Sequence, residues 1–290
     1  MTQAEGALQI RRQYPRRHRQ LVEAHAHSVE CLRNALANLN QTAPHVPLAA
    51  ETNAVLTDIF EVDVTPAMLH QIRSSCLRLL SEFTTPGLDP QSSPRYWVGL
   101  NKQRHNGTHA FVWETDPQKR IFLTEEFYVL PPETILYSDL HRSQNDMFLH
   151  HQASSLLHEV SHQVLKTVDI AYMDSFRPLL EQHDTLGGPH SQAQLYAHSL
   201  NRVRHEALSL STPDTKLFTR RGTNGRRDFR HYDGRQREMI LKLSGQSTLA
   251  EARVAFRGNP EVRAKIILAN ADSLTLLVLR LGQEVYGTTG

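Results

Sequence analysis

His158-Glu159-Val160-Ser161-His162 is the stretch on which the interpretation of this 290-residue chain depends. On a helix, two histidines four residues apart project from one face about one turn apart, so their imidazoles can bind a single Zn²⁺ ion. The intervening Glu159 then lies beside the open coordination position of the metal. This arrangement is typical of metalloproteases.

The residue types explain the expected chemistry. Neutral imidazole ligands do not cancel the charge of zinc, so the ion can lower the pKa of a bound water and polarise a peptide carbonyl. Glu159 is expected to accept the proton of that water and to pass it to the leaving amine. Because the chain contains 17 histidines, the motif can also arise by coincidence, and its surroundings have to decide.

The surroundings predict a half-buried helix. Apolar residues recur at spacings of three and four from Leu149 to Leu165, and Asn145 or Asp146 can cap the N-terminus of the helix. His158 and His162 lie beside this apolar stripe and not at its centre. A metal site that is open to a substrate requires such a position.

A third zinc ligand is expected from the residues that follow the helix. Residues 166–173 keep the Thr, Asp and Tyr of the signature G-T-x-D-x-x-Y-G. This signature follows H-E-x-x-H in the aspzincins, the deuterolysin and peptidyl-lysine metalloendopeptidase group, which the chain resembles. Two further landmarks of that family are similar here and occur in the same order: a strand-like run at 120–131 and the Ala-Asn-Ala-Asp-Ser stretch at 269–273.

The resemblance implies a zincin-like metallopeptidase with Zn²⁺ as its cofactor and a protein or peptide as its substrate. It makes His158, His162 and Asp169 the zinc ligands and Glu159 the general base. Tyr172 is expected to stabilise the oxyanion of the tetrahedral intermediate, a role that suits a phenol that donates a hydrogen bond.

The resemblance also makes Asp272 a substrate-binding residue that shapes the pocket for the side chain after the scissile bond. Lysine-specific members have a glutamate three residues beyond this aspartate, whereas this chain has Thr275, so we do not expect a strict lysine preference. Lys166 and Met173 replace both glycines of the signature. The backbone around Asp169 therefore cannot rely on the freedom of glycine at positive φ.

Two other classes of zincin place the third zinc ligand elsewhere in the sequence. The metzincin extension requires a glycine and a third histidine where this chain has Leu165 and Val168. The gluzincin plan stays open, because Glu181 follows His162 after 18 intervening residues and residues 174–184 could form the second helix that it requires.

Two classes other than a peptidase also stay open. One is a fold in which the metal site is structural or inactive. The other is a basic module that binds nucleic acid or an acidic protein through the arginines between Arg220 and Arg237, with Phe229 and Tyr232 among them. A solvated surface is the commoner explanation of such a segment, and nucleic acid is not an expected partner.

Composition sets broad limits. A net charge of +2 and 39% apolar residues indicate a globular chain with a substantial core and no global demand for nucleic acid or an anionic membrane. Cys31 and Cys76 are expected to be buried apolar residues without a disulfide framework. No signal peptide and no membrane span are apparent, so the protein is expected to be cytoplasmic as synthesised, or to be delivered as a bacterial toxin or effector by a dedicated secretion system.

The predicted fold class is α+β, mainly helical, with a small sheet before the zinc-binding helix. Residues 1–92 are expected to form an N-terminal helical subdomain and residues 93–290 the catalytic domain. Helices are expected at 18–39, 66–83 and 260–282, and strands at 96–100, 109–114 and 120–129. The run 121–128 is the expected substrate-binding edge of the sheet, and residues 1–17 are expected to be a solvated, partly mobile terminus.

Overall fold

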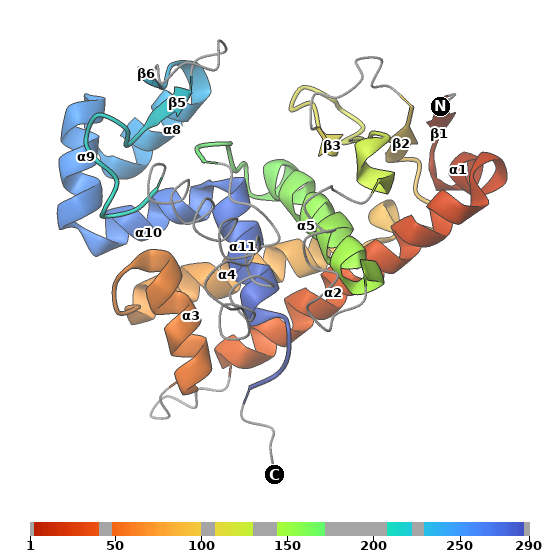
Figure 1. Cartoon of the computed structure of the whole chain (residues 1–290), viewed down its shortest axis with the longest axis horizontal. Coiled ribbons are helices and arrows are strands. Elements are labelled where there is room, and N and C mark those ends of the chain that lie inside the picture. The colour runs from red at the N-terminus through yellow and green to blue at the C-terminus, as the bar shows by residue number, and fades with distance from the viewer. Residues whose placement is uncertain are drawn as a thin grey trace, which may run out of the picture.

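The computed structural model describes residues 3–40, 48–99, 108–129, 144–171, 208–221 and 229–286. These residues form an α+β fold that is mostly helical (Figure 1). The helices are α1 (Ala7–Gln13), α2 (Pro15–Asn40), α3 (Ala50–Phe60), α4 (Pro66–Phe83), α5 (Gln144–Val164), α8 (Gly234–Ser244), α9 (Leu249–Gly258), α10 (Pro260–Ala269) and α11 (Ala271–Leu281). The strands are β1 (Ala4–Glu5), β2 (Tyr96–Val98), β3 (Ala110–Phe111), β4 (Ile121–Leu123), β5 (Thr219–Arg221) and β6 (Phe229–His231). Within the described ranges, no helix combines the length and the apolar character that a membrane crossing requires.

Helix α5, which contains the histidine motif, is surrounded by other helices. It packs against α2, α4 and α11, and Figure 1 shows it lying across α2, near α11. Its apolar stripe is buried as predicted, with Ala153, Leu156, Leu157 and Val160 at most 1% exposed. Burial of this stripe fixes the rotation of α5 about its axis, and therefore the direction in which the motif side chains project.

The small sheet is mixed, with the strand order β1-β2-β4-β3. Strand β2 runs parallel to β4, while β1 and β3 pair antiparallel with their neighbours. The expectation that 121–128 forms the substrate-binding edge is wrong, because β4 lies between β2 and β3 and ends at Leu123, before a 3₁₀ turn at Glu126–Tyr128. The edge next to β4 is β3, which also contacts α5.

Residues 4–10 pack onto the rest of the fold, contrary to the expectation that residues 1–17 form a solvated, partly mobile terminus. Ala4 and Glu5 pair with β2, and Ala7 and Ile10 of α1 are fully buried. Gly6 links the two elements at φ +79°, and its N–H donates to the carbonyl of Tyr96 at 2.7 Å. The buried side chains of Ala4, Ala7 and Ile10 anchor this segment, although polar and basic residues lie between and after them.

The expected caps of the motif helix, Asn145 and Asp146, lie inside α5, which starts at Gln144, whereas α4 and α10 begin at side-chain caps. Thr65 caps α4, with its hydroxyl accepting a hydrogen bond from the N–H of Met68 at 3.2 Å, and Asn259 caps α10.

Cys31 and Cys76 are free, buried thiols, and burial raises the pKa of each to about 12. The hydrophobic core joins side chains from both sides of position 92, and the division into two domains stays a prediction.

The helix expected at 260–282 is interrupted. Helix α10 ends at Ala269, Asn270 adopts an extended conformation with φ −85° and ψ 120°, and α11 starts at Ala271. The break brings Asn270 into a parallel β-bridge with Val168, in the segment that follows α5. Two parts of the chain that carry predicted site residues therefore meet at this break.

Candidate metal centre

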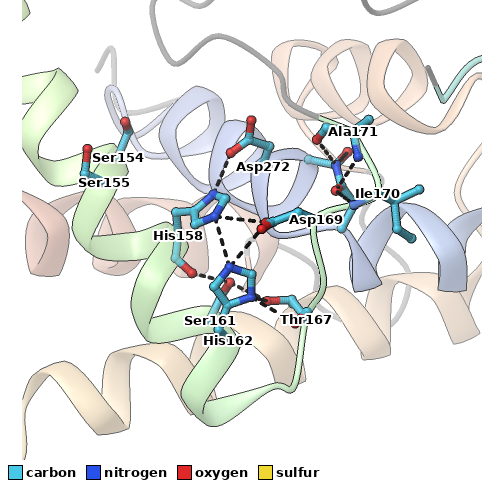
Figure 2. Close-up of polar contacts among 12 residues, drawn as sticks. Ser154, Ser155, His158, Ser161, His162, Thr167, Asp169, Ile170, Ala171 and Asp272 are labelled. Carbon is cyan, nitrogen blue, oxygen red and sulfur yellow. Dashed lines mark hydrogen bonds and ion pairs between the residues drawn. The ribbon is translucent and has the colours of Figure 1, made fainter. Parts of the chain in front are cut away.

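Three potential ligand atoms converge beyond the C-terminal half of α5 (Figure 2). The Nε2 atoms of His158 and His162 are 3.0 Å apart, and the Oδ1 atom of Asp169 lies 3.1 Å from the first and 3.3 Å from the second. A tetrahedral zinc ion with bonds of about 2.0–2.1 Å separates its ligand atoms by about 3.3 Å. The triangle thus has nearly the size that a zinc ion requires.

The Nδ1 atom of each imidazole, which points away from the three converging atoms, lies beside a hydrogen-bond acceptor. These acceptors place the imidazole proton on Nδ1 and not on Nε2. His158 donates from Nδ1 to the Asp272 carboxylate at 2.6 Å, and His162 donates from Nδ1 to the Thr167 carbonyl at 2.9 Å. In the neutral tautomers, each Nε2 atom then presents a lone pair to the other and to the Asp169 carboxylate. Three lone pairs that face one another repel unless a proton or a metal cation lies between them, and the donor set of two imidazoles and one carboxylate fits a divalent metal ion.

Asn270 builds the loop that carries Asp169. Its side-chain oxygen accepts hydrogen bonds from the N–H groups of Ile170 and Ala171 at 2.9 and 3.0 Å, and its amide nitrogen donates to the Ala171 carbonyl at 2.9 Å. The N–H of Val168 donates to the Ala269 carbonyl at 2.9 Å. One side chain at the start of α11 therefore fixes the backbone on the C-terminal side of Asp169.

Two residues at the start of α11 contact the metal-binding residues or the loop that carries them. Asn270 holds the loop, and Asp272, two residues later, orients His158. Figure 2 shows Asp272 approaching His158 from α11, while Asp169 reaches the histidines from the loop. An acceptor on the outer nitrogen fixes the ring orientation and raises the basicity of the ligating nitrogen.

The pKa values of the ligands follow from this geometry in the metal-free protein. Burial opposes a positive charge on His158, but Asp169 and Asp272 outweigh it and hold the pKa of His158 well above its usual value. Burial also opposes the charge on Asp169, but the two histidines hold the pKa of this carboxyl well below its usual range. The carboxylate is thus kept ionised, which is the form that binds a metal.

Glu159 is only 7% exposed. Burial raises the pKa of its carboxyl, and the positive charges of His158 and His162 oppose this increase. The carboxyl lies within electrostatic reach of Asp169 and Asp272 as well. A carboxyl whose pKa is raised towards neutrality is suited to accept and return a proton.

Lys166 shows how the chain manages without the first glycine of the signature. Its backbone lies at φ +61°, directly after the last turn of α5, where the chain reverses toward Thr167. This is the left-handed region that glycine enters freely and that costs other residues about 1–2 kcal/mol. The position keeps the conformation of glycine although the residue is lysine.

Glycine at position 166 is therefore expected to stabilise the protein. Lys166→Gly should raise the free energy of unfolding by about 0.5–1 kcal/mol, because relief of the left-handed strain exceeds the added backbone entropy of the unfolded chain. Denaturant unfolding would measure the change. Lys242→Gly, inside α8, is the matched control and should destabilise by about 1 kcal/mol. Equal destabilisation by both substitutions would contradict this account.

The described residues include most of the predicted site. The structure brings His158, His162, Asp169, Glu159 and Asp272 together, while Tyr172 and the alternative ligand Glu181 lie outside the described residues. The substrate-binding role of Asp272 stays a prediction beside its observed contact with His158. Thr167 and Asn270 also contribute to the site, by accepting from His162 and by holding the loop that carries Asp169, and no role was expected for either residue although both lie in the family-like stretches 166–173 and 269–273.

Neutralising Asp272 tests its contact with His158. Asp272→Asn is expected to weaken zinc binding about 10–100-fold, because an amide supports the Nδ1 proton less well than a carboxylate. Competition with a chromophoric chelator would give the affinity. Asp58→Asn, which removes a surface ion pair with Arg280, is the control and should leave the affinity unchanged. Unchanged zinc affinity in Asp272→Asn would leave Asp272 without a part in the metal centre.

The basic segment is partly engaged with the rest of the chain. Arg235 pairs with Glu114, and the hydroxyl of Tyr232 donates to the carbonyl of Ile170, next to Asp169. Tyr232, which directly follows the hairpin formed by β5 and β6, therefore contacts the loop that carries Asp169. Nucleic-acid binding by this segment stays an open alternative and not an expectation.

Compared with protein-family models, with curated proteins and with solved structures, the chain gives no match.

Proposed function

We propose that this protein is a zinc-dependent endopeptidase with a zincin-like fold and the ligand set of the aspzincins. The observation that carries the proposal is the convergence of His158 Nε2, His162 Nε2 and Asp169 Oδ1 within 3.3 Å of one another. Among the described residues, these three would leave the fourth position of a tetrahedral zinc ion open, which distinguishes catalytic from structural zinc sites. Delivery as a toxin or effector stays a prediction.

Each residue of the centre has a distinct task. Bound zinc supplies a water of lowered pKa and polarises the carbonyl of the scissile bond. Glu159 accepts the proton of the attacking water and delivers it to the leaving amine. Asp272 and Thr167 hold the two imidazoles in the tautomers that direct Nε2 to the centre.

The position of β3 suggests how a peptide is held. Within the described sheet, β3 is an edge strand, and it contacts α5. An extended peptide can pair with such an edge through main-chain hydrogen bonds, which leaves the choice of sequence to side-chain pockets. We therefore place the substrate along β3 in place of the run 121–128.

Metal removal tests the function. The zinc-loaded protein is expected to cleave a mixture of unstructured peptides at internal bonds, to lose this activity when dialysed against 1,10-phenanthroline, and to regain it when zinc is restored. Mass spectrometry of the products would locate the cleaved bonds. A protein that binds one zinc ion per chain and cleaves nothing would contradict the proposal and indicate a structural metal site.

A further inference from the structure

A pocket opens beside the metal centre. Its volume is about 140 Å³, and its wall includes His162, one of the three metal-ligating residues. The rest of the wall comes from the segment that follows β3 and from the residues around the end of α5: Val112, Trp113, Glu114, Asp116, Pro117, Lys119, Gln163 and Lys166. A space of this size can hold one amino-acid side chain.

The acidic residues of the wall already have cationic partners. Asp116 receives two hydrogen bonds from the guanidinium of Arg120, at 2.8 and 2.9 Å, and its side chain is 1% exposed. This contact lowers the pKa of Asp116. Glu114 pairs with Arg235. Both carboxylates are therefore neutralised by arginines that do not line the pocket.

The amide of Gln163 is also engaged. Its oxygen accepts from Arg95 at 2.6 Å, and its nitrogen donates to the carbonyls of Lys119 and Arg120 at 3.0 and 3.2 Å. The lysines differ. Among the described residues, no ion pair involves the ammonium group of Lys119 or Lys166, and both residues are exposed.

The pocket therefore combines two lysines with an apolar wall. Trp113 is 53% exposed, and its ring is held against Phe122 and Phe111 at centroid distances of 4.6 and 5.5 Å. Val112 and Pro117 add aliphatic surface. Such a wall suits the methylene groups of a side chain whose end is anionic.

We infer that this pocket is a specificity subsite of the proposed peptidase and that it selects a glutamate of the substrate, close to the scissile bond. The inference rests on the proposed function. The aliphatic part of the glutamate lies against Trp113 and Pro117, and its carboxylate pairs with Lys119 and Lys166. Aspartate fits less well because its shorter side chain offers less apolar contact to the wall.

Charge reversal at the two lysines tests the inference. The zinc-loaded protein would be incubated with a proteome-derived peptide mixture, and the residues around each cleaved bond would be counted. We expect glutamate to be enriched at one fixed position near the bond. Lys119→Glu and Lys166→Glu should each lower kcat/KM for a glutamate-containing peptide about tenfold, which corresponds to a loss of about 1.4 kcal/mol.

Lys242→Glu is the matched control, because it makes the same charge change on α8, outside the pocket wall. It should leave the sequence preference and kcat/KM unchanged. Cleavage without a preference for glutamate, or a preference that survives both pocket substitutions, would overturn the inference while leaving the peptidase intact.

A binding experiment separates the two proposals. The α-hydroxamates of glutamic acid, glutamine and lysine would be titrated into zinc-loaded Glu159→Gln protein, because a hydroxamate binds zinc and offers its side chain to the neighbouring subsites. We expect the glutamic acid compound to bind about tenfold more tightly than the other two, and Lys119→Glu to abolish the difference. Equal binding of all three would overturn the subsite alone, whereas no binding of any of them would overturn the metal centre and the subsite with it.

Discussion

Asp169→Ala is expected to remove zinc from the protein, whereas Glu181→Ala is expected to leave one zinc ion bound per chain. Asp169 supplies the only carboxylate oxygen of the triangle, 3.1 and 3.3 Å from the two Nε2 atoms. Its loss leaves two neutral imidazoles, which bind the ion less tightly because no anionic ligand compensates its charge. Since changes beyond the direct ligands already cost 10–100-fold in affinity, we expect a loss of more than about 100-fold here.

Metal analysis of purified wild type, His158→Ala, Asp169→Ala and Glu181→Ala would measure the stoichiometry, with circular dichroism to verify that each variant is folded. His158→Ala is the positive control for loss of zinc under either ligand scheme. Zinc retained in Asp169→Ala and lost in Glu181→Ala would replace the proposed ligand set with the gluzincin alternative. Retention in every variant would mean that zinc binds elsewhere.

The metal triad could be predicted from the sequence because its determinants are mostly local. Two histidines four residues apart on a helix must share a face, and the buried stripe from Ala153 to Val160 fixes the direction of that face. Asp169 is only seven residues beyond His162, so a short reversal at Lys166 returns it to the histidines. Spacing brings the three residues to one end of α5, and Asn270 from a distant segment holds the backbone beside Asp169.

The break between α10 and α11 could not be predicted from local signals. Residues 260–282 keep the apolar spacing of one helix, and Asn270 leaves the helical conformation where its side chain accepts hydrogen bonds from the N–H groups of Ile170 and Ala171, about 100 positions earlier in the chain. The hydrogen bonds that replace those of a continuous helix are made with the segment around Ile170, which is distant in the sequence. Tertiary contacts of this kind override helix propensity.

The sheet shows a similar limit. The strand-like runs at 96–100, 109–114 and 120–129 correspond to β2, β3 and β4, but each strand is shorter than predicted. The order of these strands in the sheet depends on the pairing of β4 with β2 and with β3. The spacing of apolar residues within each strand does not determine which strands pair. The topology shows that β3, and not β4, is an edge strand of the described sheet, and the proposal that β3 binds the substrate rests on this order.

Glu159→Gln is expected to abolish measurable peptide hydrolysis while one zinc ion per chain stays bound. Glutamine has nearly the same shape as glutamate but cannot accept a proton at neutral pH, so the attacking water loses its base and the leaving amine loses its proton donor. General acid–base catalysis of this kind contributes about 10²–10⁴-fold, and we expect kcat to fall by that factor. The metal site should be intact, because Glu159 is not one of the three ligating residues.

Stopped assays at saturating substrate, with zinc measured on the same samples, would separate loss of catalysis from loss of metal. Glu238→Gln, an exposed position on α8, is the matched control and should retain full activity. If Glu159→Gln binds zinc and keeps wild-type kcat, Glu159 is not the base and another carboxyl must serve the reaction. If it loses zinc instead, its buried carboxyl stabilises the centre electrostatically, as its proximity to His158 and His162 allows, and the loss of activity then says nothing about proton transfer.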